Sequence, residues 1–388
     1  MDGSESFTVD HMPDPIASPE GQLDPYPWYQ KMRDTAPVRY DETRECWDMF
    51  QYDDIQTVLT DFDTFSSEHD ISLGNESEDS ALDLGETMIN RDPPEHERLR
   101  GIVDEYFQPG YLRQFEENFE ELAHTQLDQI LADGTEFDFA SEFAAPIPAI
   151  VIGEILGIPR EKREILTGVR QDGDNTQREL KEYITGLVQE RKETPTDDIL
   201  SEVIHATPDG KEMTAEEIYN FCALLLLAGS HTTVTLLTNA IWMFTEHDFI
   251  SDVRVGAIDL DTAIEEVLRY QPSVHTVVRT ATEDVALHGN TIQEGDRIVA
   301  WVGSANRDPR QFDDPETFDP ERKPNPHMTF GRGIHVCLGA PLARLEARTV
   351  LRVFFDRISD VDVTTDERTP ITTPTLWGLQ TLPISVRT

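Results

Sequence analysis

The feature that most constrains the fold of this chain is one long apolar stretch, Phe221 to Phe244, with the sequence FCALLLLAGSHTTVTLLTNAIWMF. Thr214 and Glu217 precede it at the spacing of a capping box, in which each side chain binds the backbone amide of the other residue. The pattern predicts one helix from Thr214 to about Thr245. Because this helix is apolar on nearly every side, we expect it to be buried along its length.

The other periodic segments predict more helices than strands. Residues 37–50 form a predicted hairpin, because PVRY and CWDMF flank the polar turn DETRE. Helical spacing covers residues 95–106, 112–132, 147–156, 261–270 and 338–358, and strand-like runs cover residues 285–287, 297–302, 361–363 and 382–386. The expected fold class is mainly α with small β-sheets (α+β). Without repeats or long linkers, residues 1–388 are expected to form a single domain, with a flexible N-terminal segment over residues 1–20.

The charge of the chain excludes some classes of partner. It has 75 Asp and Glu against 32 Lys and Arg, for a net charge of -43. Because such a surface repels phosphate groups, we expect neither a nucleic-acid nor a membrane partner. Only six basic residues are lysine. An acidic, lysine-poor chain is typical of cytoplasmic proteins from extremely salt-loving organisms, where salt screens self-repulsion over about 3 Å at 1 M. The alternative is an ordinary acidic protein with disordered acidic loops.

The cysteines and the N-terminus bear on the cellular compartment. Cys46, Cys222 and Cys337 are too few and too scattered for a disulfide framework, which indicates a reducing environment. Residues 1–21 are acidic and lack an apolar core, so we expect neither a signal peptide nor an anchor there. The longest unbroken apolar run, residues 221–228, is shorter than the roughly 20 residues of a membrane span. The chain is therefore expected to be a soluble, cytoplasmic monomer.

Residues 330–339, FGRGIHVCLG, carry the strongest chemical signal, because glycines at positions 331, 333 and 339 surround Cys337. Glycine lets backbone amides approach a charged sulfur closely. A helix begins just after the cysteine, with Pro341 in its first turn. The N-terminus of a helix stabilises a thiolate and lowers the cysteine pKa. These are the requirements of an anionic axial ligand to heme iron. Cys46 and Cys222 are expected to be ordinary core residues.

This loop matches the pattern FGxGxHxCxG at every fixed position, and the chain resembles a cytochrome P-450 of the soluble microbial type over nearly its whole length. The resemblance implies the P-450 fold, with heme b (iron protoporphyrin IX) between the long central helix and the helix after the cysteine. It also implies that Cys337 is the metal ligand, that Phe330, Gly331 and Gly339 help to bind the heme, and that O2 is the cosubstrate.

Four cations match the positions that bind the heme propionates in this family. His96 and Arg100, in HERLR, lie four residues apart on one helix face. Arg279 follows the helix that carries an ExxR motif, and His335 precedes Cys337 by two residues. Cations at these positions would neutralise the two propionates. Read alone, the pair in HERLR would be solvated surface charges.

Residues 228–233, AGSHTT, resemble the oxygen-activation segment AGx[D/E]T[T/S] of the family. The resemblance implies that Ala228 contacts the heme, that Gly229 leaves room for O2, and that Thr232 delivers protons. A glycine followed by hydroxyl residues also loosens helical hydrogen bonding. His231 stands where the family usually has Asp or Glu. It either relays protons near neutral pH or points outward and leaves the relay to Thr232 and water.

Two further parts of the resemblance concern the core and the substrate. Glu266, Arg269 and Arg322 match a buried structural network of the family. Residues 157–201, which form the lid over the substrate, look shorter than usual. The remaining pocket segments match residues 71–89, the helix near Ala228, 274–278 and 375–379. Their mixed apolar side chains, with His275, Thr276 and Trp377, predict a small to medium, mostly apolar organic substrate.

The helix after the cysteine is basic in an otherwise acidic chain. Arg344, Arg348 and Arg352 recur every four residues on one face, which predicts a docking surface for an acidic ferredoxin. The alternative is internal pairing, for example of Arg348 with Glu346 or Asp356. No second cysteine cluster or nucleotide-binding glycine motif occurs in the sequence, so the electrons are expected from a separate ferredoxin and its NAD(P)H-dependent reductase.

The predicted activity is that of a heme-thiolate monooxygenase that hydroxylates or epoxidises its substrate. Two alternatives remain open at this point. One is a heme-thiolate enzyme that does not use O2, such as a peroxygenase, dehydratase or isomerase. The other is a heme-binding sensor or carrier without catalysis. The hydroxyl of Thr232 and the basic face favour the monooxygenase.

Overall fold

The computed structural model describes residues 12–68, 87–163, 166, 173–207, 213–371 and 376–388. The chain divides into two compact units, each built from separate segments. Among the described residues, the first unit lies within 67–114 and 145–231, and the second within 12–66, 115–144 and 232–388. The long helix α11 (Ala215–Glu246) contributes residues to both units. The expected single domain over residues 1–388 stays a prediction.

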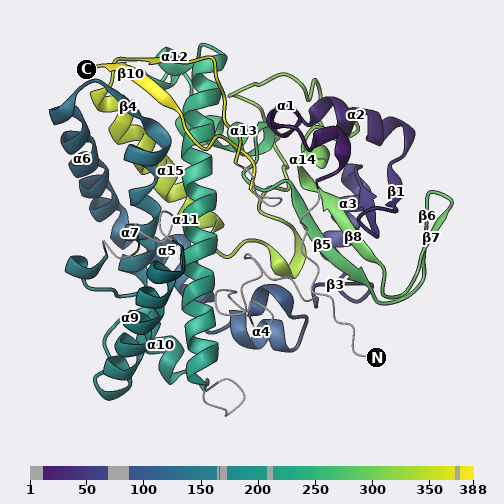
Figure 1. Cartoon of the computed structure of the whole chain (residues 1–388), viewed down its shortest axis with the longest axis horizontal. Helices are drawn as coiled ribbons and strands as arrows, with labels where there is room; N and C mark the ends of the chain where they lie inside the picture. Colours follow the sequence, from purple (N-terminus) through teal and green to yellow (C-terminus); the bar gives the residue numbers. More distant parts are fainter. Residues whose placement is uncertain (1–11, 69–86, 164–165, 167–172, 208–212, 372–375) are drawn as a thin grey trace. The chain divides into compact units, whose positions relative to one another are not determined.

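The described part of the first unit is helical. Besides the first half of α11, its helices are η3 (Met88–Asn90), α4 (Glu95–Arg100), η4 (Asp104–Phe107), α5 (Pro109–Leu112), α7 (Pro146–Ile155), η7 (Arg160–Lys162), α9 (Gly173–Glu193) and α10 (Ile199–His205). Helices α9 and α10 pack together, as Figure 1 shows. The single helix predicted over residues 95–106 is wrong. The amides of Ile102 and Val103 bond three residues back, to Leu99 and Arg100, and these tighter turns end α4.

Helix α11 begins as its sequence predicts. The Thr214 amide donates to the Glu217 carboxylate at 2.6 Å, and the Glu217 amide donates to the Thr214 hydroxyl at 3.1 Å, which confirms the capping box. By length and composition alone this helix is also able to cross a membrane. However, 72% of the segment that meets that criterion is buried inside the protein, as expected for a core helix.

A five-stranded sheet of order β1-β2-β8-β5-β3 forms part of the second unit. Its strands are β1 (Val38–Asp41), β2 (Cys46–Met49), β3 (Phe65–Ser66), β5 (Thr276–Ala281) and β8 (Arg297–Trp301). The hairpin is confirmed, with Val38 opposite Met49 in antiparallel register. Strand β8 runs parallel to β2 and antiparallel to β5. Apolar side chains of this sheet pack with α3 (Tyr52–Thr60) in a buried cluster.

The second unit also holds two smaller sheets. Strands β4 (Glu136–Asp138), β10 (Pro383–Arg387) and β9 (Asp360–Val363) form one, and β6 (Val285–Leu287) and β7 (Asn290–Ile292) form the other. Its remaining helices are η1 (Asp14–Ile16), α1 (Pro19–Leu23), α2 (Tyr26–Thr35), α6 (Glu116–Asp133), the π-helix η6 (Phe139–Ala144), α12 (Ile250–Arg254), α13 (Leu260–Tyr270), α14 (Val302–Ala305), η10 (Gly333–His335) and α15 (Ala340–Arg357). A short 3-10 helix, η5 (Arg113–Phe115), has residues in both units.

The fold class, mainly α with small β-sheets, is confirmed. Helices α6 and α15 pack against each other and carry much of the core of the second unit. The expected flexible segment covered residues 1–20. Residues 1–11 lie outside the described residues, and η1 and α1 are helical, with Ile16 buried. Parts of the predicted lid and of the pocket segments 71–89 and 375–379 also lie outside the described residues.

Candidate functional site

The cysteine loop closes through its own backbone. The Cys337 amide donates to the Phe330 carbonyl at 2.8 Å. Gly331 and Gly333 have φ of 70° and 69°, the left-handed region that glycine enters without strain. A Cβ at Gly333 would lie 2.7 Å from the carbonyl oxygen of Leu59, so no larger residue fits there. The loop therefore needs glycine both for its turns and for its approach to α3.

The thiol of Cys337 lies at the start of a helix. Gly339 is the N-cap of α15, two residues after the cysteine, and Cys337 is exposed. Cys46 and Cys222 are buried, and burial raises the pKa of each thiol to about 12. The expectation that these two are core residues is confirmed. Among the three cysteines, Cys337 alone combines access with the positive end of a helix dipole.

The four predicted propionate ligands lie in different units. Arg279 (on β5) and His335 (at the end of η10) belong to the second unit, and the Arg279 side chain is 7% exposed. His96 and Arg100, on α4, belong to the first unit. His96 is buried, so it is not a solvated surface charge, and burial lowers its pKa. Arg100 forms an ion pair with Asp104, Nε to Oδ1 at 3.3 Å.

The predicted oxygen segment lies in the middle of α11. Ala228 is exposed and Gly229 half-buried, although most of the helix is buried. A Cβ at Gly229 would lie 2.6 Å from the end of the Ile152 side chain on α7, so a larger residue would require that side chain to shift. The Ser230 hydroxyl donates to the Leu226 carbonyl at 2.6 Å. His231 and Thr232 are both half-buried. A direct role of His231 stays a prediction.

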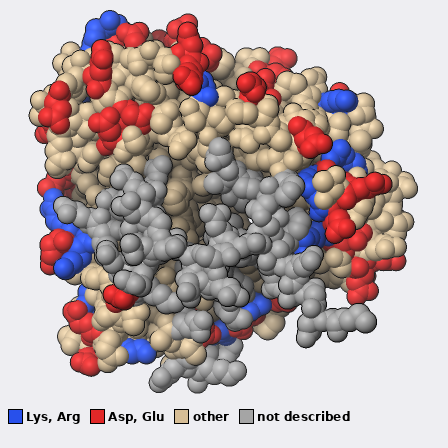
Figure 2. Space-filling model, viewed as in Figure 1, with Lys and Arg blue, Asp and Glu red and all other residues tan. Residues whose placement is uncertain are grey.

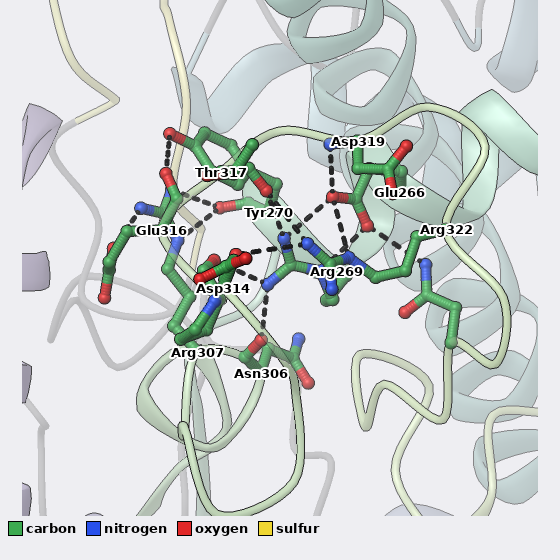
Figure 3. Close-up of polar contacts among 12 residues, drawn as sticks. Glu266, Arg269, Tyr270, Asn306, Arg307, Asp314, Glu316, Thr317, Asp319 and Arg322 are labelled. Atoms are coloured by element: carbon green, nitrogen blue, oxygen red, sulfur yellow. Dashed lines mark hydrogen bonds and ion pairs between the residues drawn. The ribbon is translucent and has the colours of Figure 1, made fainter.

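The predicted core network is confirmed, with Glu266 and Arg269 buried and Arg322 half-buried (Figure 3). Glu266 and Arg269 on α13 are both 0% exposed and pair through two hydrogen bonds of 2.7 and 2.8 Å. Arg322 donates from Nε to the same carboxylate at 3.2 Å. Arg269 also donates to the carbonyls of Asn306 and Pro315, each at 2.9 Å. The network ties α13 to the chain between β8 and the cysteine loop.

The comparisons with known proteins agree with this site. The cytochrome P-450 family model matches residues 260–386, which include Arg279 and Cys337. The putative cytochrome P-450 YjiB of Bacillus subtilis is 35% identical, over 93% of this chain and 94% of that protein. The cyclomarin C epoxidase CymV of Salinispora arenicola is 34% identical, over 96% of this chain and 98% of that protein. This chain belongs to the cytochrome P-450 family.

Solved structures support the same assignment over the whole chain. The testosterone complex of CYP109E1 from Bacillus megaterium superposes with a TM-score of 0.85 at 35% identity, over 96% of this chain and 100% of that one. Members of the family are monooxygenases that use heme iron and O2. The residues present fit that cofactor, because an accessible thiol stands at a helix N-terminus and a buried guanidinium lies on β5 of the same unit.

The arginine row of this P-450 is mostly paired. Arg344 donates to Glu265 at 2.6 and 2.9 Å, and its guanidinium lies 4.5 Å from the centre of the Phe330 ring. Arg348 pairs with Glu116 at 3.3 Å and with Asp261 at 3.8 Å. The alternative of internal pairing is therefore confirmed for Arg348, but its suggested partners Glu346 and Asp356 are wrong. Glu346 is instead buried, and burial raises its pKa well above the usual value.

Arg352 differs from its two neighbours in the row, because it is exposed to solvent. The face around Arg344 and Arg348 is hollowed into a groove of about 460 Å³. Its lining includes the charged residues Asp261, Glu265, Arg322, Lys323, Arg344 and Arg348. Four cations and two carboxylates make this groove more basic than the chain as a whole.

The structural roles of two buried residues were not identified from the sequence. Arg307 lies between the rings of Tyr26 and Tyr270, 3.3 and 3.5 Å from their centres, and pairs with Glu316 at 2.8 Å. Its contacts, partly visible in Figure 3, are structural.

The second is His275, which was expected to line the substrate pocket but is 0% exposed. It stacks on Trp377 at 4.4 Å between ring centres, and its Nδ1 lies 2.9 Å from the Tyr29 hydroxyl. Burial lowers the pKa of His275 to about 3, so the ring is neutral. No local pattern marks either residue, since their partners are distant in the sequence.

Proposed function

We propose that Cys337 is the single protein ligand of the heme iron and that this enzyme inserts one oxygen atom of O2 into an apolar substrate by hydroxylation or epoxidation. The observation that carries the proposal is the exposed Cys337 thiol, held by a self-closed glycine loop at the start of α15. Bound heme iron supplies the activation of O2 and the transfer of one oxygen atom. The protein supplies the ligand, the charges and the protons.

The heme-binding residues proposed beside Cys337 are of two kinds. Phe330, Gly331 and Gly339 of the loop, and Ala228 of α11, would contact the porphyrin. His96, Arg100, Arg279 and His335 would bind the propionates. The position of Arg279 supports this role, because it places a cation on β5 that can bind a carboxylate through charge-assisted hydrogen bonds.

Thr232 is the proposed proton donor of the reaction, with Gly229 leaving room beside it on α11. The half-burial of Thr232 supports this, because a proton relay needs both contact with water and a fixed position. His231 is proposed as a second relay group, since histidine as a residue type accepts and releases protons near neutral pH more readily than a carboxylate does.

The proposed substrate is a small to medium, mostly apolar molecule. Similar proteins support this class. Solved structures of CYP109E1 contain testosterone or corticosterone, and CymV is a cyclomarin C epoxidase. A screen of apolar compounds, with both steroids included, for shifts of the heme absorption band would identify ligands. A library in which only charged compounds shift the band would contradict the proposed class.

Electrons are proposed to come from a ferredoxin and its NAD(P)H-dependent reductase. Arg344 and Arg348 already bind carboxylates, so exposed Arg352 is the better docking cation of the row. We expect Arg352→Glu to slow ferredoxin-supported heme reduction roughly threefold without changing substrate affinity. Arg357→Glu, on the same helix but paired with Asp128, is the matched control. If heme is reduced as fast in Arg352→Glu as in Arg357→Glu, Arg352 is not part of the docking surface.

One experiment separates this function from its alternatives. Turnover is compared with hydrogen peroxide alone and with ferredoxin, reductase, NAD(P)H and O2. Product is expected with the complete electron-transfer system. Turnover with peroxide alone would indicate a peroxygenase, and the absence of substrate-dependent NAD(P)H consumption would indicate a sensor or carrier.

We also propose a cytoplasmic monomer from a salt-loving organism. Figure 2 shows acidic side chains spread over the visible face, with fewer basic ones. The net charge of -43 opposes compaction unless salt screens it. The melting temperature is therefore expected to rise between low and molar potassium chloride, and a constant melting temperature would contradict the salt adaptation.

A further inference from the structure

Two hydrogen bonds fasten one face of α11 to the loop that follows α13, all within the second unit. The Ser273 hydroxyl donates to the Thr232 carbonyl at 3.0 Å. The side-chain amide of Asn239 donates to the Gln271 carbonyl at 3.0 Å. Thr232 and Asn239 are about two helical turns apart and therefore lie on the same face of α11. The loop is thus bonded to this face at Gln271 and at Ser273.

Trp377 and Gly378, near the C-terminus, contact the same loop and α11. The Trp377 amide donates to the Ser273 carbonyl at 2.9 Å. The next residue, Gly378, packs directly on α11, since a Cβ there would lie 2.6 Å from the Thr235 methyl carbon. Thr235 is three residues from Thr232 and lies on the same face. Ser273 therefore bonds to the helix with its side chain and to Trp377 with its backbone.

The Ser273 hydroxyl donates to the Thr232 carbonyl, which also accepts a hydrogen bond within the helix. In an α-helix the carbonyl of residue 232 accepts the amide of Leu236. A second donor on that carbonyl biases the tilt of its peptide group and weakens its hold on the amide. Ser273 is buried, so water does not replace the hydroxyl without cost. The bond consequently acts on the backbone at Thr232 from outside the helix.

The residues just before Ser273 are themselves held in place by hydrogen bonds. It begins at the end of α13, where Glu266 and Arg269 are fully buried in their network. Gln271 is bonded a second time, because its side-chain oxygen accepts the Tyr26 hydroxyl at 2.8 Å. A hydroxyl held in this way can transmit a fixed position to the helix, which a mobile loop cannot.

We infer that Ser273 is a positioning residue for proton delivery: its hydroxyl holds the α11 backbone at Thr232 and so sets where the Thr232 side chain lies. This inference rests on the proposed role of Thr232. Ser273 acts through the Thr232 backbone, so it is not a catalytic residue. Its loss is expected to leave heme and substrate binding in place and to uncouple electron use from product formation.

The first test measures the effect of the hydrogen bond from Ser273 to the Thr232 carbonyl, called the anchor, and does not require substrate turnover. Amide hydrogen exchange is followed in the heme-loaded protein, in peptides that cover residues 233–239. Ser273→Ala is expected to change exchange there by about two- to tenfold, the effect of one hydrogen bond, and Ser273→Thr is expected to restore the wild-type rate. Ser304→Ala is the control, since this buried serine also donates to a carbonyl, that of Phe50, away from α11. Unchanged exchange in Ser273→Ala would overturn the anchor.

The second test measures hydrogen peroxide released per NADPH consumed, with a heterologous ferredoxin and reductase and testosterone as the probe substrate. Ser273→Ala is expected to release more peroxide than wild type, and Ser273→Thr and Ser304→Ala are not. The double variant Ser273→Ala/Thr232→Ala should match Thr232→Ala alone. Wild-type peroxide in Ser273→Ala, beside high peroxide in Thr232→Ala, would overturn the positioning role. Wild-type peroxide in Thr232→Ala would refute the proposed role of Thr232 instead, and the positioning role with it.

Discussion

The cysteine loop and the part of α11 around Thr232 are held in place in different ways. In the loop, the Cys337 amide bonds to the Phe330 carbonyl, and left-handed glycines make the turns. Around Thr232, the anchoring hydroxyl comes from Ser273, 41 positions along the chain. The loop carries its geometry in its own sequence, whereas the helix segment receives part of its geometry from elsewhere. Changes in the loop should therefore act locally and strongly, and changes around α11 more weakly and at a distance.

The largest expected effect is at the thiol itself. Cys337→Ser should abolish the strongly red-shifted Soret band that a thiolate-ligated heme shows in its reduced carbonyl complex, because serine does not supply a thiolate. Cys222→Ala, which changes a buried neutral thiol on α11, is the control and should keep the band. A red-shifted band that persists in Cys337→Ser would refute the ligand assignment.

Alanine substitutions at two glycines of the loop would distinguish the cost of backbone strain from the cost of steric crowding. Gly331 and Gly333 have nearly the same φ, but only Gly333 lies against the Leu59 carbonyl. Gly331→Ala should cost about 1–2 kcal/mol of unfolding free energy for the left-handed backbone. Gly333→Ala should cost at least about 1 kcal/mol more, since the Cβ meets backbone that does not yield. Denaturant unfolding of the heme-loaded protein measures both, and equal losses would show that crowding is unimportant.

On the α11 side, Thr232→Ala should lower product formed per NAD(P)H by roughly tenfold or more, as the loss of a proton donor does. Heme content and substrate affinity should stay the same. Thr233→Ala, at the buried neighbouring position, is the control. His231→Ala measured beside them tests whether the histidine takes part. Unchanged coupling in Thr232→Ala would mean that protons arrive by another route.

Mild acid should lower the stability of the two regions at different pH values, and this effect should be smaller than those of the substitutions above. His275, beside the anchoring loop, has its pKa lowered to about 3 by burial, against an ordinary value of 6.5. The unfolded chain therefore takes up a proton as the pH falls below about 6.5 while the folded protein does not, so stability is lost from there down to about pH 3.

Glu265 on α13, whose partner Arg344 contacts the Phe330 ring of the cysteine loop, has a different acid limit. Burial tends to raise the pKa of Glu265, but hydrogen bonds from Arg344 and His327 outweigh it and lower the pKa from 4.5 to about 2. This contribution to stability is full above about pH 4.5 and is lost as the pH falls toward 2. At pH 5, amide exchange should therefore increase in residues 233–239 before it does in residues 328–339. The reverse order would contradict the assignment of the earlier acid-dependent loss of stability to His275.

Local sequence was sufficient wherever the interacting residues are close together in the chain. The capping box at Thr214 and Glu217 was predicted from its spacing, because both hydrogen bonds join residues three apart. The hairpin of residues 37–50 followed from alternating strands around a polar turn. The glycine pattern around Cys337 indicated the loop, since its turns and its closing bond lie within ten residues.

The tertiary structure decided which distant groups meet. Strand β5 was missed because a strand with buried residues on both faces lacks the alternation that marks a half-buried one. The partners of Arg344 and Arg348 came from α13 and α6, not from their own helix. His275 was assigned to a pocket and proved to be core, and Ser273 gave no signal in the sequence. Hydrogen bonds and ion pairs depend on distances of a few ångströms, and for residues far apart in the chain only the packed fold determines those distances.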